Sequence, residues 1–338
     1  MNIRHFSKQL PFIHPFTISK GTKTHQPSFI VELEWKGLKG YGEAPAITYY
    51  SITVEQMAED LEKNRMVLEK FALTDPERYW HFLHHLFPNN PFLVCALDMA
   101  GWDLWGKMLK KPLYELWRLN LQSLPVTDYT IGIDSAEMMV KKMKEKEWPV
   151  YKVKMGFEGD MELLAELRKH TNAALRVDAN AGWTLRQALA KLQIMKDLGV
   201  ELIEQPLAKD DWDGMSQLYR ASDIPLFADE SCVFESDVEK CAGYFHGINI
   251  KLTKCSGITP ARRMIRRAHD LGIKVMLGCM NESTIGTSAM IHLAPTVDYL
   301  DADGPLLLAE DLATGLYYDH GRISFVSPSP GLSIKQLL

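Results

Sequence analysis

Three acids and two lysines each stand at the end of a short apolar run that is typical of a buried strand. Asp178, Glu204 and Asp229 close the runs ALRVD, VELIE and IPLFAD. Lys154 and Lys251 close the runs on either side of them. Successive members are roughly 25 residues apart, the length of one strand and one helix in a (β/α)8 barrel. Because the strands of such a barrel end at one mouth, we expect the five side chains to converge there.

The three carboxylates are predicted to bind a metal ion. Carboxylate oxygens are hard ligands, and three of them, with room left for water and a substrate carboxylate, suit one Mg²⁺ ion per subunit. A single acid at such a position is more often a helix cap or part of an ion pair, but here three consecutive units place an acid at the same point. Asn180 shares a face with Asp178, and Glu230 is expected to pair with Lys251, so both are predicted to support the ligands from behind.

Two lysines lie on the strand before the acids. Lys152 and Lys154 are two residues apart in YKVKMG, so they share a face, and an orientation toward the mouth brings their ammonium groups together. Each ammonium is expected to lower the pKa of the other, and a nearby cation adds to that effect, as a lysine base requires. Lys154 is closer to the strand end and is predicted to be the base. The alternative is an exposed strand on which both lysines face water.

A second lysine base is predicted across the barrel. Lys251 follows the sixth expected strand and Lys154 ends the second, so they approach a bound substrate from opposite sides. This arrangement suits inversion of a carbon centre. One lysine removes the proton α to a carboxylate, the metal stabilises the enediolate, and the other lysine returns a proton to the opposite face. The alternative for Lys251 is a surface lysine in a loop, and its apolar approach argues against that.

The elements that must position these residues fall into three stretches. Residues 1–50 alternate like an antiparallel meander with a hairpin turn in GLKG, and a helical pattern starts at Thr53, the expected N-cap. Eight apolar runs then alternate with helical segments: PVTDYTIGI, PVYKVKMG, ALRVDANAG, VELIEQP, IPLFADES, GINIKLTKCSG, KVMLGC and DYLDADGP. We predict an α/β fold, in which a (β/α)8-type barrel, residues 121–307, carries an α+β capping domain, residues 1–120, joined by the C-terminal tail, residues 308–338.

Composition narrows the class of partner. The chain has 338 residues, of which 46% are hydrophobic and 24% charged, and its net charge is -5 without a basic stripe, so no nucleic-acid partner is expected. No stretch approaches the roughly 18 apolar residues that a membrane span needs, and the first residues lack the apolar segment of a signal peptide. Five scattered cysteines fit reduced thiols. We therefore expect a cytoplasmic protein that binds a small molecule.

The run CALDMAGWDLWGKMLKKP resembles the cap-domain helix of the mandelate racemase and muconate lactonizing group in the enolase superfamily. The Lys152/Lys154 pair, the three acids and Lys251 match the muconate lactonizing subgroup, and the resemblance covers essentially the whole chain. It implies the enolase-superfamily fold, a lysine base and a magnesium-stabilised enediolate. The mandelate racemase branch differs, since it places a His-Asp pair on the later strands.

A further acidic pair narrows the subgroup. Asp301 and Asp303 flank Ala302 at the end of the eighth expected strand, so both carboxylates share a face and suit a cationic group. In this family such a pair is characteristic of dipeptide epimerases, in which it binds the free amino terminus of the substrate. The resemblance thus implies a dipeptide epimerase acting on the α-carbon of the C-terminal residue. The alternative is an acidic turn before Gly304.

Substrate choice is expected to lie in the cap. Ala-Glu epimerases carry an arginine in the loop that corresponds to residues 16–25, whereas this chain has Lys20 and Lys23, which pair a carboxylate without the bidentate geometry of arginine or are simply solvated. Phe16 and Ile18 favour a small or apolar second residue such as Ala or Val. An L-Ala-D/L-Glu epimerase remains the alternative. Two further residues are positioned to touch substrate, Thr130 on the first strand and Cys279 after the seventh.

Two other functions remain open. An o-succinylbenzoate synthase or N-acylamino-acid racemase shares the lysines and acids, but its substrate has no ammonium for Asp301 and Asp303. A non-catalytic ligand-binding barrel would not need both Lys154 and Lys251. A homo-oligomer is compatible with an exposed cap sheet.

Overall fold

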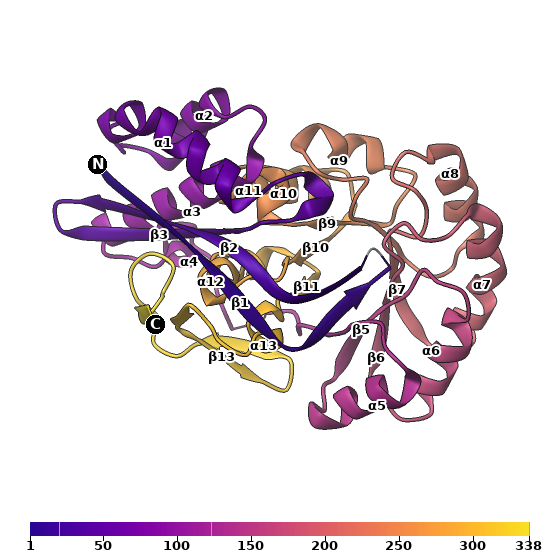
Figure 1. Ribbon diagram of the computed structural model, residues 1–338. Coiled ribbons are helices and arrows are strands. Elements are labelled where there is room, and N and C mark those ends of the chain that lie inside the picture. Colours follow the sequence, from indigo (N-terminus) through magenta and orange to yellow (C-terminus); the bar gives the residue numbers. More distant parts are fainter. Residues whose placement is uncertain (20, 123, 338) are drawn as a thin grey trace.

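A computed structural model describes residues 1–19, 21–122 and 124–337 of the chain (Figure 1). The N-terminal part forms a sheet with helices, and it lies against an eight-stranded parallel barrel. This is the predicted architecture. Among the described residues, no helix combines the length and the apolar character needed to cross a membrane.

The cap sheet is antiparallel and follows chain order. It contains β1 (Asn2–Ile18), β2 (Gly21–Trp35) and β3 (Leu38–Pro45). The expected hairpin is present, but its turn lies one residue earlier than GLKG: Trp35 pairs with Leu38 across Lys36 and Gly37, which have φ values of 50° and 79°, and residues 38–40 already belong to β3. Two consecutive positive φ values match the twist of a two-residue hairpin turn. The segment expected to be a loop at residues 16–25 instead continues the β1–β2 ladder, with Phe16 opposite Lys23.

The cap helices are packed behind this sheet. They are η1 (Thr48–Tyr50), α1 (Val54–Lys70), α2 (Pro76–Leu86), α3 (Pro91–Met108) and α4 (Leu113–Leu116). The predicted cap of α1 is confirmed, since the Thr53 side chain accepts from the Gln56 N–H. Helix α3 is buried on nearly all sides. It approaches β3 so closely that a Cβ atom at Gly42 would lie 1.9 Å from the Ala96 carbonyl oxygen.

All eight predicted barrel strands are present. They are β4 (Tyr129–Ile131), β5 (Val150–Lys154), β6 (Ala174–Asp178), β7 (Val200–Glu204), β8 (Leu226–Ala228), β9 (Gly247–Ile250), β10 (Lys274–Gly278) and β11 (Tyr299–Asp301). The sheet keeps this order from β4 to β11. Its two edges meet at a single bridge between Thr127 and Leu300, next to a hydrogen bond from the Asp128 N–H to the Leu300 carbonyl.

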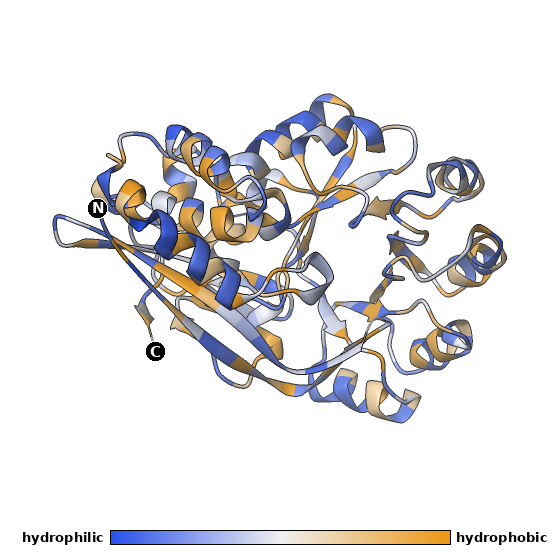
Figure 2. Ribbon diagram, turned by 45° about the horizontal axis from the view of Figure 1, so that its top comes forward, coloured by the Kyte–Doolittle hydropathy of each residue, from blue (hydrophilic) through white to orange (hydrophobic). Residues whose placement is uncertain are grey.

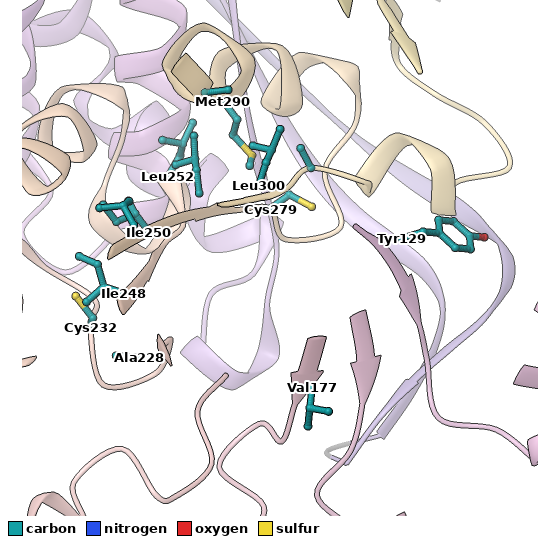
Figure 3. Packing of buried hydrophobic residues seen from close by; sticks show 14 of the residues in the cluster. Tyr129, Val177, Ala228, Cys232, Ile248, Ile250, Leu252, Cys279, Met290 and Leu300 are labelled. Atoms are coloured by element: carbon teal, nitrogen blue, oxygen red, sulfur yellow. The ribbon is translucent and has the colours of Figure 1, made fainter. Parts of the chain in front are cut away.

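Helices follow the strands. They are α5 (Ala136–Glu145), α6 (Asp160–Arg168), α7 (Leu185–Asp197), α8 (Trp212–Ala221), α9 (Glu235–Cys241), α10 (Leu252–Cys255), α11 (Ile258–Asp270), α12 (Thr284–Leu293), η2 (Ala294–Thr296) and α13 (Gly304–Leu307). The longer ones cover the outside of the barrel, and the one-turn helices α10 and α13 lie at its mouth, just after β9 and β11. The outer helices carry both polar and apolar residues (Figure 2), as expected of helices with one face toward a sheet. Ile248, Ile250 and Met290 are fully buried in the layer between strands and helices (Figure 3). Since side chains alternate along a strand, Asn249 and Lys251 face the other way, into the barrel.

Buried carboxylates of the cap hold two barrel helices. Glu43 of β3 accepts hydrogen bonds from the N–H groups of Ser283 and Gly286, at 3.1 and 3.0 Å, where α12 begins. Asp98 of α3 accepts from the N–H and the hydroxyl of Thr259, at 3.0 and 2.7 Å, in the first turn of α11. The first N–H groups of a helix have no partner within the helix. The cap therefore completes the barrel helices and is fixed to them.

The C-terminal tail returns to the cap. Leu308 bridges Phe12 of β1, and the Leu332 N–H donates to Asp103 of α3 at 2.8 Å. Between these points lie the hairpin β13–β14 (Leu316–Asp319, Arg322–Phe325) and the short pair β12–β15 (Ala313–Thr314, Gln336–Leu337). The domain boundaries at residues 120/121 and 307/308 stay predictions.

We expect Gly42→Ala to lower the free energy of unfolding by more than about 3 kcal/mol, because the added methyl group meets backbone that cannot move aside. Gly199→Ala is the control, since its Cβ meets no atom within 4 Å and only the positive φ of 69° costs free energy, about 1–2 kcal/mol. Denaturant unfolding of both variants measures the difference. Equal losses would show that the contact between α3 and β3 tolerates a methyl group.

Candidate active site

The five residues predicted to converge lie at one end of the barrel. Lys154, Asp178 and Glu204 are the last residues of β5, β6 and β7. Asp229 and Lys251 directly follow β8 and β9. All five side chains are buried. The parallel sheet thus brings residues from five strands to one mouth, as the spacing in the sequence predicts.

A cavity of about 380 Å³ opens between this mouth and the cap. From the barrel it is lined by Thr130, Lys152, Lys154, Asn180, Asp229, Glu230, Lys251, Cys279, Asp301 and Asp303. From the cap it is lined by Phe16, Ile18, Gly21, Thr22, Lys23 and the segment 47–50. Of the predicted site residues, Asp178 and Glu204 alone are absent from the cavity lining among the residues described; they lie against its lysines. Lys20 lies outside the described residues.

Each acid predicted to bind metal contacts a lysine. The Lys154 ammonium lies 2.6 Å from Asp178 Oδ2, and the Lys251 ammonium lies 2.8 Å from Asp229 Oδ2. The Lys152 ammonium lies between strands, 2.7 Å from Glu204 Oε2 and 3.3 Å from Asp178 Oδ2. Lysine and carboxylate charges therefore balance at the floor of the cavity.

The three carboxylates suit a divalent cation. Burial raises the pKa of Glu204 to about 7, and the charges of Asp178 and Asp229 add to this effect. Glu204 Oε2 is buried and, although near Lys152, lacks hydrogen-bond geometry with any described residue. A divalent cation would relieve the repulsion between the three carboxylates and give that oxygen a partner. The donor set, hard oxygens only, matches the predicted Mg²⁺.

The lysines differ from expectation in one respect. Burial lowers the pKa of Lys152, but Asp301, Glu204, Asp178 and Asp128 raise it more, so the net shift is upward. The pKa of Lys251 is also raised, because Asp229 and Glu204 outweigh burial. The predicted downward shift of Lys152 is therefore wrong for the structure without a cation. That prediction considered only the neighbouring ammonium of Lys154, whereas carboxylates from other strands raise the pKa of Lys152.

The acidic pair Asp301 and Asp303 lies at one end of the cavity. Asp301 Oδ2 accepts from the Lys152 ammonium at 2.7 Å. Asp303 accepts from the Thr130 N–H at 2.6 Å and from the Cys279 thiol at 3.7 Å. Ligand atoms of Cys279, Asp301 and Asp303 lie within 4.8 Å of one another. Burial and the charge of Asp301 raise the pKa of Asp303 to about 6, so near neutral pH both carboxylates offer negative charge to a cation.

Supporting contacts come partly from unpredicted residues. Asn180 supports Asp178 through its backbone N–H, at 3.0 Å from Oδ1. Asn249 donates to Glu204 Oε1 at 2.8 Å, and Gln205 Oε1 accepts from the Asp229 N–H at 3.0 Å. Asn249 precedes Lys251 by two residues, so the alternation of side chains along the strand could have identified it. The pairing of Glu230 with Lys251 stays a prediction.

The hairpin tip of the cap supplies the remaining wall. Lys23 lines the cavity, its ammonium lies 3.4 Å from Gln26 Oε1, and burial lowers its pKa. Phe16, on the opposite strand of the hairpin, lines the same cavity. The described part of the cap thus presents the Lys23 ammonium and apolar side chains toward the barrel mouth.

Two family models match the chain. Residues 2–117 match the mandelate racemase/muconate lactonizing enzyme N-terminal domain, and residues 134–336 match the enolase C-terminal domain-like family. An L-Ala-D/L-amino acid epimerase of Flavobacterium johnsoniae is 49% identical over 92% of this chain and 93% of its own length. An L-Ala-D/L-Glu epimerase of Bacteroides thetaiotaomicron is 37% identical over 100% of this chain and 88% of its own.

Solved structures of epimerases have a similar fold. A substrate-liganded L-Ala-D/L-Glu epimerase from Bacillus subtilis superposes with a TM-score of 0.94 at 29% identity, covering 100% of this chain and 99% of that one. A dipeptide epimerase from Cytophaga hutchinsonii, complexed with Mg and D-Ala-L-Val, has a TM-score of 0.91 at 27% identity, covering 99% and 96%.

We expect Glu204→Gln to raise the Mg²⁺ dissociation constant at least about 10-fold, because it removes one charge and one oxygen ligand. Calorimetric titration of the purified protein measures the change. Glu166→Gln, on the exposed side of α6, is the matched control and should bind as the wild type does. Equal affinities of both variants would place the cation elsewhere.

Proposed function

Because the chain belongs to the mandelate racemase and muconate lactonizing enzyme family, we propose that it is a Mg²⁺-dependent dipeptide epimerase that inverts the α-carbon of the C-terminal residue. One observation carries the proposal. Lys154 and Lys251, four strands apart in the barrel, line the same cavity as the pair Asp301 and Asp303. The epimerase relatives and the Mg-complexed structural neighbours support it.

In the proposed reaction the two lysines share the proton transfer. Lys154 removes the α-proton from one face of the substrate carbon, and Lys251 delivers a proton to the other face, so the configuration inverts. In the reverse direction their tasks exchange. Asp178, Glu204 and Asp229 hold the cation, which supplies stabilisation for negative charge on the substrate carboxylate. Lys152, which contacts Asp178, Glu204 and Asp301, offsets part of their negative charge near the substrate.

We infer that Asp301 and Asp303 bind the free ammonium of the dipeptide. Both are buried at the cavity wall, and Thr130 and Cys279 hold the Asp303 carboxylate in place. An acylated amine or a second anion at that end would face negative charge. This argues for a dipeptide over the substrates of an N-acylamino-acid racemase or o-succinylbenzoate synthase.

The second substrate residue is proposed to be small or apolar. Phe16, Ile18 and Tyr50 give the cap side of the cavity an apolar character, and the described part of the hairpin tip holds no arginine. Lys23 supports the L-Ala-D/L-Glu alternative, since its half-buried ammonium would pair with a glutamate side chain.

We propose that the protein is located in the cytoplasm. We also propose that it forms a homo-oligomer through the cap. Support for the first comes from the five cysteines, all present as free thiols, which fit a reducing compartment. The exposed Phe6 and Ile13 on the cap sheet are compatible with the second.

Incubation with a dipeptide library in D₂O and Mg²⁺ tests the function. We expect one deuterium to enter dipeptides that have a free amino terminus, as mass spectrometry would record. Labelling of Ala-Ala and Ala-Val over Ala-Glu would support the apolar preference, and the reverse would support pairing with Lys23. If deuterium enters N-acylated amino acids while the dipeptides stay unlabelled, the proposed binding of the ammonium by Asp301 and Asp303 is contradicted.

The two lysines should be separable by substrate configuration. We expect Lys154→Ala and Lys251→Ala each to reduce epimerisation by about 10²–10⁴-fold, the range of a lost acid–base group. Each variant should still exchange the α-hydrogen of one epimer, and the two variants should retain opposite epimers, as NMR in D₂O would show. Lys191→Ala, an ion-paired lysine on α7, is the control. Wild-type exchange of both epimers by Lys154→Ala would exclude it as a base.

A further inference from the structure

Lys254 is a buried lysine that the reaction does not use. Its side chain is 1% exposed, and it is absent from the cavity lining among the residues described. Lys152, Lys154 and Lys251, in contrast, all reach the cavity. Lys254 is therefore placed where it cannot touch a substrate, although it lies beside a residue that can bind metal.

The Lys254 ammonium is surrounded by oxygens. It donates to the Asp229 carbonyl at 2.6 Å, to the Cys232 carbonyl at 3.1 Å and to the Asn249 carbonyl at 3.2 Å. It also contacts the Asp229 carboxylate through Oδ1. One ammonium thus holds the backbone and the side chain of Asp229, the loop after β8 and the end of β9.

The one-turn helix α10 places two lysines on the same carboxylate. Lys251 is its N-cap residue, and Lys254 lies three residues further on, so both side chains project from the same face. Lys251 reaches Asp229 Oδ2 at 2.8 Å, and Lys254 reaches Oδ1. The carboxylate is consequently held from both oxygens, by one lysine that faces the cavity and one that does not.

We propose that Lys254 is a positioning residue that orients Asp229 and the loop 229–232 for cation binding. The proposal rests on the proposed function, in which Asp229 is a metal ligand. Gln205 holds the same loop from the other side, through hydrogen bonds from the N–H groups of Asp229 and Ser231 to its Oε1, both at 3.0 Å. Lys254 and Gln205 together therefore hold Asp229 and its loop in place, Lys254 through its positive charge and Gln205 through its side-chain amide.

Removal of Lys254 has two opposing effects on a cation at Asp229. A positive charge is lost from the neighbourhood, which favours the cation. The carbonyls of Asp229, Cys232 and Asn249 and the Asp229 carboxylate lose their contact with the ammonium, the Asp229 carbonyl keeps only the Cys232 N–H at 3.2 Å, and Lys251 alone then pulls on the carboxylate. Loss of residues that orient a metal ligand typically costs about 10–100-fold in metal affinity. Because Lys254 contacts backbone as well as side chain, orientation is expected to outweigh charge.

Calorimetric titration with Mn²⁺, a substitute for Mg²⁺, tests the proposal on the intact protein. We expect Lys254→Met to raise the Mn²⁺ dissociation constant about 10–100-fold. The control is Lys142→Met, which removes another buried, ion-paired lysine: Lys142 lies on α5, and its ammonium is 2.9 Å from the Asp134 carboxylate. This variant should bind Mn²⁺ within twofold of wild type. If Lys254→Met is not folded by circular dichroism, Lys254→Gln, which retains two donors, gives the measurement.

A second readout separates positioning from chemistry. At saturating Mn²⁺, α-hydrogen exchange by the Lys254 variant should recover to within a few-fold of the wild-type rate, because Lys254 transfers no proton. Unchanged or tighter Mn²⁺ binding overturns the proposal, as does exchange that stays lost at saturation. If the wild type itself binds no Mn²⁺, the proposed metal site at Asp229 fails and the positioning role fails with it. Wild-type binding with an unaffected variant leaves the proposed function intact.

Discussion

Buried charge in the barrel mouth is tolerated because every ammonium there lies against a carboxylate. Lys152, Lys154, Lys251 and Lys254 are all nearly inaccessible, and each contacts at least one acid. A single ion taken from water into a protein interior costs several kcal/mol, and removal of one partner from a buried pair leaves the other charge uncompensated. The position of each member therefore depends on its partners, and the geometry of the mouth depends on the six strands β5, β6, β7, β8, β9 and β11 that contribute them.

Residue order along the chain was enough to place the main site residues. Strand ends spaced by one βα unit identified Asp178, Glu204, Asp229 and both bases, because a parallel barrel delivers every strand end to one rim. The partners of these residues were harder to predict. The raised pKa of Lys152 depends on carboxylates from distant strands. Lys254 acts through a single helical turn whose existence the apolar pattern does not reveal, although its spacing of three from Lys251 is visible in hindsight.

Buried carboxylates also hold the cap against the barrel. Glu43 and Asp98, carboxylates of the cap, complete the unpaired N–H groups at the starts of α12 and α11. A carboxylate at a helix N-terminus also meets the positive end of the helix dipole. Sequence patterns of the cap alone could not reveal these contacts, since donor and acceptor lie far apart in the chain. Their effect is to fix β3 and α3 of the cap against the barrel helices.

The single bridge between Thr127 and Leu300 has a consequence for how the molecule is made. During synthesis β4 emerges before its neighbour β11, so one edge of the growing sheet keeps unpaired N–H and C=O groups until the last barrel strand is complete. Contacts between residues so distant in sequence form slowly, and open edges invite pairing with other chains. Barrel closure is then the step at which this protein is most exposed to misassembly, and also the step that brings Asp301 to Lys152.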